Sequence, residues 1–285
     1  MSTTISKTGV RELATVTPGR PASDGDGVRM TRIIGTPELN MLDPFLLLDA
    51  FGSDQPQDYI GGFPSHPHRG FETVTYLLAG RMRHKDNAGN EGVIEPGGVQ
   101  WMTAGRGIVH SEMPEQENGL LMGFQLWVNL PARAKMTAPA YQEYPPAGVP
   151  LEQRENGTQV RVVAGITSAG TVGAVNNDWV TPTYLDVTLP AGLAFEQPVG
   201  TGDNAFLYVI EGALTVGSAP QPLAQGMLGI LGPGDRVRVS AAEDARFLLV
   251  SAQPLNEPVA RGGPFVMNTR EEIIQAFDDY RNNRF

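Results

Sequence analysis

Two short motifs of this sequence each recur in similar form about 130 residues later. YLLAGRM at 76–82 resembles YVIEGAL at 208–214, and IEPGGVQW at 94–101 resembles ILGPGDRV at 230–237. Short apolar runs that end at Gly and Pro are typical of β-strands joined by tight turns. A repeat of this length indicates two copies of one domain. The sequence therefore predicts an all-β protein with two similar domains.

The composition supports this fold class and excludes several functions. Gly (34) and Pro (23) are plentiful, which favours short strands over helix bundles. The net charge is −10 and there is no Lys/Arg run, which argues against direct binding to nucleic acid or acidic membranes. The absence of cysteine excludes disulfides and thiolate chemistry. With no secretory signal and no apolar run near the roughly 18 residues of a membrane span, we expect a cytoplasmic protein.

The composition also suggests where the two domains meet. Pro, Ala, Tyr, Glu and Gln dominate the segment 136–159, which is typical of a crossover linker. We therefore expect a first domain over 1–135 and a second over 160–285.

One helix is predicted, over 269–281. Asn268 or Thr269 can cap it, and Glu271 and Glu272 favour the positive end of its dipole. We expect this helix to end the second domain and to pack across a barrel; binding of a partner is the alternative. Its apolar face is formed by Ile273, Ile274, Phe277 and Tyr280.

Histidine pairs supply the main functional signal. His66 and His68 are separated by one residue, as are His110 and Glu112, and strand-like sequence adjoins each pair. Residues i and i+2 project from one face of a strand, whereas on a helix they would lie about 200° apart. Two neighbouring strands could thus bring three imidazoles and a carboxylate to one point. This ligand set suits a divalent transition metal, and iron, nickel, cobalt, manganese, copper and zinc all stay open.

The second half of the chain contains no histidine. When it is aligned by eye on the repeat, the ligand positions fall near Pro198, Gly200, Phe247 and Leu249. Only the first domain can therefore bind metal in this way.

Other polar residues near the pairs are assigned simpler roles. His84 lies among charged residues before a turn, so we expect a solvated strand end rather than a ligand. Arg69 and Arg106 flank the pairs; each could orient a ligand, anchor an anionic substrate or form a surface salt bridge. Ser111 forms no catalytic triad with His110, because adjacent strand residues face opposite ways.

Three long motifs resemble the pirin family of bicupin proteins. They are HPHRGFETVTYLLAG at 66–80, QWMTAGRGIVHSEMP at 100–114 and GPFVMNTREEI at 263–273, and the resemblance runs from about residue 20 onward. It implies two tandem cupin barrels of the jelly-roll type. It also implies one mononuclear iron, Fe(II), in the first barrel only, with His66, His68, His110 and Glu112 as its ligands.

The resemblance implies two alternative activities. One is a quercetin 2,3-dioxygenase, an oxidoreductase that opens the heterocycle of a flavonol with O2. In that reaction Glu112 is the expected catalytic residue and accepts the proton of the flavonol 3-hydroxyl. The other is a non-enzymatic, iron-dependent redox-sensing regulator that acts through a protein partner.

The resemblance also bears on residues around the metal. Glu72 occupies the position of a metal-binding Glu in the wider cupin pattern; in pirins that role passes to Glu112, so we expect Glu72 beside the ligands. Aromatic and apolar side chains could line the barrel around an aromatic substrate. The candidates are Phe63, Phe71, Trp101, Met102, Phe124 and Trp127.

Overall fold

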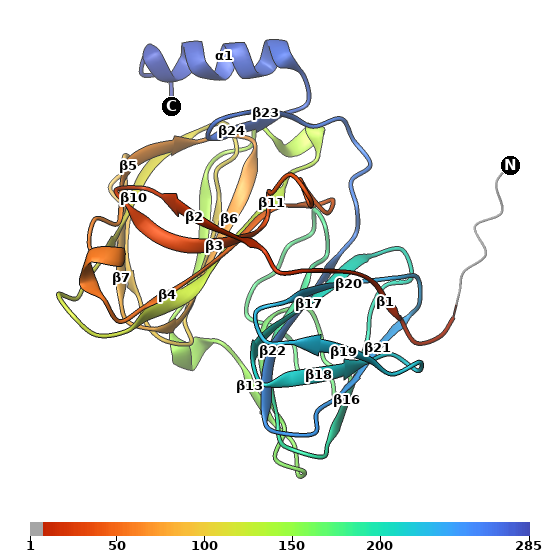
Figure 1. Ribbon diagram of the computed structural model, residues 1–285. Helices are drawn as coiled ribbons and strands as arrows, with labels where there is room; N and C mark the ends of the chain where they lie inside the picture. Colours follow the sequence, from red (N-terminus) through yellow and green to blue (C-terminus); the bar gives the residue numbers. More distant parts are fainter. Residues whose placement is uncertain (1–7) are drawn as a thin grey trace, which may run out of the picture. The chain divides into compact units, whose positions relative to one another are not determined.

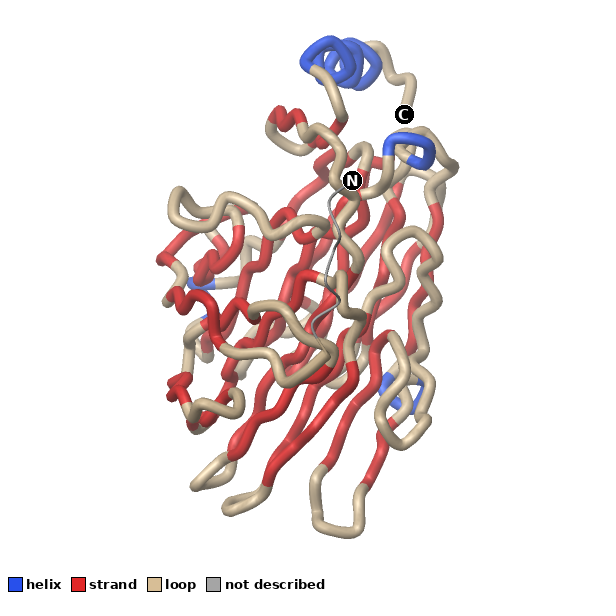
Figure 2. The backbone as a smooth tube through the Cα atoms, turned by 90° about the vertical axis from the view of Figure 1, so that its right-hand side faces the viewer, coloured by secondary structure: helices blue, strands red, loops and turns tan. Residues whose placement is uncertain are grey.

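Strands make up most of the regular structure in the computed structural model, which describes residues 8–285 (Figures 1 and 2). The predicted all-β class, two cupin barrels followed by a helix, is confirmed. Over the described residues, no helix is both long and apolar enough to cross a bilayer. Three single-turn 3-10 helices lie in connections: η1 (Pro56–Asp58), η2 (Ala132–Ala134) and η3 (Pro146–Gly148).

The first barrel is built from two antiparallel sheets. The larger has the strand order β12 (Ala140–Tyr144), β9 (Val99–Thr103), β6 (Phe71–Ala79), β11 (Leu121–Asn129), β4 (Phe45–Ser53), β3 (Val28–Ile34) and β2 (Arg20–Asp24). The smaller has the order β5 (Phe63–His68), β10 (Ile108–Pro114), β7 (Met82–Asp86) and β8 (Glu91–Ile94). In β7 the strand geometry directs every second side chain into the barrel, and buried and exposed residues alternate accordingly.

The second barrel has the same pair of sheets. The larger has the order β1 (Leu13–Thr17), β20 (Leu228–Leu231), β17 (Asn204–Glu211), β22 (Ala245–Ala252), β15 (Thr183–Leu189), β14 (Gln159–Ala164) and β13 (Leu151–Gln153). The smaller has the order β16 (Ala194–Pro198), β21 (Arg236–Ser240), β18 (Ala213–Val216) and β19 (Gln221–Ala224). One continuous apolar cluster fills this barrel.

Strand order corrects the alignment made by eye. In the smaller sheets β5 and β10 correspond to β16 and β21. The counterpart of His110 therefore lies in β21, whereas Phe247 and Leu249 lie in β22, the counterpart of β11. The repeated motifs fix β6 to β9 but not the strands after them, which is why the alignment drifted.

The contacts divide the chain differently from the expected boundaries at 135 and 160. One compact unit joins Arg20–Gly148 to Leu255–Phe285, and the other joins the described part of the first 19 residues to Val149–Pro254. The segment expected to be a linker, 136–159, contains β12 and β13, which pair into different sheets. Each end of the chain thus belongs to the unit formed mainly by the other half of the sequence. Local composition does not reveal this arrangement, because it depends on which strands pair.

Helix α1 (Arg270–Arg281) packs on the first unit rather than ending the second barrel. The Thr269 side chain accepts a hydrogen bond from the Glu272 backbone, and the Glu272 side chain accepts from the Thr269 backbone, forming a capping box. Its buried side lies against the hairpin of β23 (Ala260–Gly262) and β24 (Phe265–Met267). The predicted helix is thus confirmed, but two residues of its predicted apolar face, Ile274 and Tyr280, are exposed.

Candidate metal centre

The three predicted histidine ligands come together inside the first barrel. Strands β5 and β10 pair so that His66 lies opposite His110, and the i, i+2 spacing keeps His68 on the same face as His66. One ligand atom from each histidine lies within 4.8 Å of the others. His68 and His110 are buried and His66 is half-buried.

The hydrogen bonding of these imidazoles fits a bound cation. His66 Nδ1 lies 2.8 Å from the Pro64 carbonyl oxygen, which makes Nδ1 the donor and leaves a lone pair on Nε2. That lone pair faces His68 Nε2 at 3.0 Å. Both ring nitrogens of buried His110 have no hydrogen-bond partner among the described residues. Buried nitrogens that converge without donors are the arrangement expected of metal ligands.

Burial keeps the ring nitrogens in the form that binds metals. It lowers the pKa of His68 well below its ordinary value, and neighbouring His110 and His66 lower it further. Burial also lowers the pKa of His110 to about 4, although the nearby Glu112 carboxylate opposes this shift. Both imidazoles are therefore neutral near pH 7, as metal coordination requires.

Glu112 lies beside the histidines but is held by other residues. Its Oε1 accepts a hydrogen bond from Thr75 Oγ1 at 2.7 Å, and its Oε2 accepts one from Gln125 Nε2 at 3.3 Å. The carboxylate is not in the group of ligand atoms that converge within 4.8 Å. Its role as fourth ligand therefore stays a prediction. Glu72 also lies outside that group, and its Oε1 accepts from Thr103 Oγ1.

A pocket of about 790 Å³ opens onto this centre. Two of the six expected apolar lining residues, Phe63 and Trp127, line it. The other four are buried away from the pocket lining: Phe71, Trp101, Met102 and Phe124. Sequence reasoning missed its polar wall, which consists of Asp24, Asp26, Arg32, Asp49, Gln125 and Arg261.

Comparison with known proteins agrees with this architecture. The Pirin family model matches residues 27–128, and the model of the Pirin C-terminal cupin domain matches 184–285. The chain belongs to the pirin family. It is 57% identical to a pirin-like protein of Caulobacter vibrioides over 97% of this chain and 99% of that protein. It is 46% identical to human pirin over 92% of this chain and 90% of that protein.

A solved structure shows that the fold likeness extends over the whole molecule. A quercetin 2,3-dioxygenase from Acinetobacter baumannii superposes with a TM-score of 0.89 at 35% identity. The match covers 97% of this chain and 98% of that one.

In this member of the pirin family His84 is not a solvated strand end. The residue is buried, and its Nε2 lies 2.5 Å from Glu143 Oε2. The alternation in β7 explains the error, because Arg83 and Lys85 face outward while His84 faces inward. Its contact with Glu143 in β12 leaves no local signal in the sequence. The alternation along β7 was the only sequence feature that could have shown that His84 is buried.

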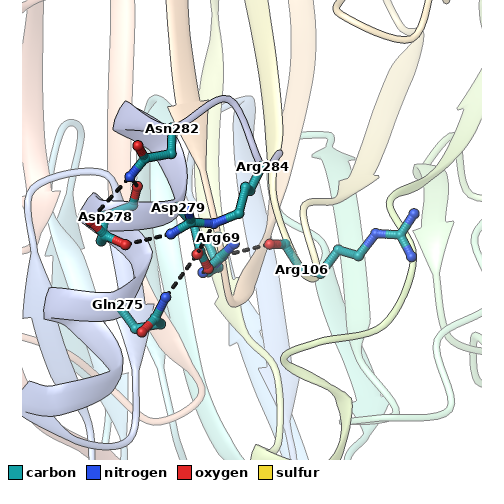
Figure 3. Close-up of polar contacts among 7 residues, drawn as sticks. All are labelled: Arg69, Arg106, Gln275, Asp278, Asp279, Asn282 and Arg284. Atoms are coloured by element: carbon teal, nitrogen blue, oxygen red, sulfur yellow. Dashed lines mark hydrogen bonds and ion pairs between the residues drawn. The ribbon is translucent and has the colours of Figure 1, made fainter.

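Arg69 and Arg106 also have different roles from each other. The Arg69 side chain is buried and forms an ion pair with Asp279 of α1 at 2.7 Å (Figure 3). Arg106 is exposed, and its carbonyl oxygen accepts a hydrogen bond from Arg69 Nε at 2.5 Å (Figure 3). Arg69 therefore forms a buried ion pair rather than a surface salt bridge.

Proposed function

We propose that this protein is a metal-dependent dioxygenase of the quercetinase type, with Fe(II) as its metal and a flavonol such as quercetin as its substrate. The observation that carries the proposal is a three-histidine centre that opens into a pocket of about 790 Å³. Pockets of this size accept drug-sized aromatic molecules. The similar Acinetobacter structure of a quercetin 2,3-dioxygenase supports the same reaction.

The chain supplies a metal-binding group and a base side by side. His66, His68 and His110 would hold the metal, and the converging nitrogens described above fit that role. When bound, the metal supplies Lewis-acid chemistry for a substrate oxygen and for O2.

Glu112 would accept the proton of the flavonol 3-hydroxyl. It lines the same pocket as His66 and His68, so its carboxylate is within reach of a substrate bound there. Thr75 and Gln125 hydrogen-bond its two oxygens and so fix their direction. Phe63 and Trp127 offer apolar surfaces for the flavonol rings.

Two variants test this assignment against a surface control. Glu112→Gln keeps the shape of the side chain but removes the base, and we expect kcat to fall by roughly 100- to 10,000-fold. His66→Ala removes a ligand, and we expect both metal content and activity to be lost. Lys85→Ala, at an exposed position on the outward face of β7, is the matched control and keeps both.

The assay follows quercetin loss, O2 uptake and CO release with iron-loaded protein, next to elemental analysis. Undiminished turnover in both Glu112→Gln and His66→Ala would remove this mechanism. A regulator acting through a protein partner would need the metal but no pocket for a small molecule. A wild-type protein that holds iron, turns over no flavonol of a panel and captures a partner would favour that alternative.

A further inference from the structure

Arg69 connects both ligand-bearing strands of the first barrel to helix α1. It follows His68 directly, at the end of β5. Its Nε donates to the carbonyl oxygen of Arg106, in the turn that leads into β10. Its Nη1 donates to Asp279 Oδ2 in α1 at 2.7 Å, and Figure 3 shows the side chain between these two partners.

The backbone of Arg69 is tied to the same C-terminal segment. Its carbonyl oxygen accepts a hydrogen bond from the backbone N–H of Val266 at 3.0 Å, and it forms a bridge with Phe265. The hairpin of β23 and β24 under the helix thus holds the main chain, while the helix holds the side chain.

Phe285 covers this ion pair. The guanidinium carbon of Arg69 lies 4.3 Å from the centre of the Phe285 ring, a cation–π contact. The ring also lies against Gly107, where an added Cβ would come within 2.7 Å of Phe285 Cγ. Phe265 and Tyr280 pack around the same ring. The side chain of Arg69 is consequently only 4% exposed.

The planar guanidinium of a buried arginine can donate to two different partners at once and so hold them in a fixed relative position. Removing one partner of a buried charge pair leaves the other charge without compensation, so the local structure rearranges. Arg69 follows the last residue of β5 and Arg106 precedes β10, so both lie at the end of the strand pair where His68 is opposite Ile108. Backbone pairing already fixes the distance between the two strands, so the link at Arg69 acts on the orientation of this end of the pair and of His68 next to it.

We propose that Arg69 is a positioning residue that holds the shared end of the two histidine-bearing strands and so orients His68, and that Asp279 of helix α1 and Phe285 after the helix fix it in place. This inference rests on the proposed metal centre. It assigns α1 a role in metal affinity, in addition to covering the barrel.

The experiment compares two neighbouring aspartates of α1. Asp279→Asn removes the charge that pairs with buried Arg69 and with exposed Arg284, whereas Asp278→Asn removes a charge that pairs with Arg284 alone of these two arginines. Co(II) serves as the probe, with affinity measured by competition against a chelator and geometry followed by the visible absorption of the bound ion. Melting of each metal-free variant reports on folding.

We expect Asp279→Asn to weaken Co(II) binding about tenfold or more, within the range seen when supporting groups of metal ligands are changed. Its Co(II) spectrum changes as well, and Asp279→Glu restores part of both. Asp278→Asn matches the wild type. If Asp279→Asn does not fold, Phe285→Leu, which removes the aromatic cover from Arg69, decides by the same two readouts.

Wild-type affinity and spectrum in a folded Asp279→Asn or Phe285→Leu variant would overturn the inference. So would an equal loss in Asp278→Asn, because the effect would then belong to the helix in general. A wild-type protein that binds no Co(II) and no iron would sink the proposed function itself, a result that the variants alone do not produce.

Discussion

The two barrels share one strand order but have opposite interiors. In the first, β5 and β10 direct three histidines inward. In the corresponding strands β16 and β21, the buried residues are Phe195, Gln197, Val237 and Val239. The three apolar ones belong to the continuous core of the second barrel. The cupin fold therefore needs no metal, and the first barrel differs by carrying polar groups where its twin carries apolar ones.

Gln197 shows how the second barrel accommodates a buried polar side chain. Its Nε2 donates to the carbonyl oxygens of Ile166 and Pro198, and its Oε1 accepts from the backbone N–H of Ser168. Within residues 8–285, neither ring nitrogen of His110 has such a partner. A satisfied buried amide costs little, whereas unsatisfied ring nitrogens destabilise the fold unless a ligand binds them. The difference indicates that one interior is built for stability and the other for binding.

The largest expected effect on metal binding comes from making the first interior resemble the second. His110→Leu replaces the two unsatisfied nitrogens by an apolar side chain. We expect metal affinity to fall by more than about 100-fold, because a ligand is lost rather than a supporting group. The metal-free variant gains about 1 kcal/mol of stability, because buried unsatisfied groups are removed. Chelator competition and urea unfolding measure the two changes.

His84→Leu is the companion variant for this exchange, since His84 is buried in the same barrel but its Nε2 contacts the Glu143 carboxylate at 2.5 Å. It removes the contact between buried His84 and the exposed Glu143 carboxylate and is expected to destabilise the metal-free protein. If His110→Leu retains metal, or destabilises the protein as much as His84→Leu, the contrast between the two interiors is wrong.

The largest expected effect on folding stability tests the apolar barrel. Phe247 is fully buried and packs edge-on against Phe195 with ring centres 5.8 Å apart. We expect Phe247→Ala to cost about 3–5 kcal/mol of unfolding free energy through the cavity it leaves. Metal affinity of the folded protein is unchanged, because this residue belongs to the other compact unit. Phe247→Leu is the milder companion variant, and metal loss in either one would show that the barrels are coupled.

Sequence reasoning succeeded where a local pattern carries the structure. The i, i+2 spacing was enough to gather His66, His68 and His110, because strand geometry fixes which side chains share a face. It failed for Arg69 and Asp279, which lie 210 positions apart and leave no periodic signal. The placement of α1 on the first unit failed for the same reason. The residues that support a site are set by tertiary contacts, so they are the least visible in a sequence.

The smallest expected effect concerns acid, and it separates the helix-bearing barrel from its twin. Hydrogen bonding to Arg69, followed by Arg284, lowers the pKa of Asp279 from 3.8 to about 2. Because the folded value lies below the unfolded one, the carboxylate stabilises the fold fully above pH 3.8, and this contribution is lost as the pH falls through 2. Solvent screening limits its size to the order of 1 kcal/mol. Asp279→Asn should therefore be less stable than the wild type at pH 4.5, with the gap closing towards pH 2 in urea unfolding. A gap that stays constant with pH would mean that the Arg69 pair contributes no acid-sensitive stability to the first barrel.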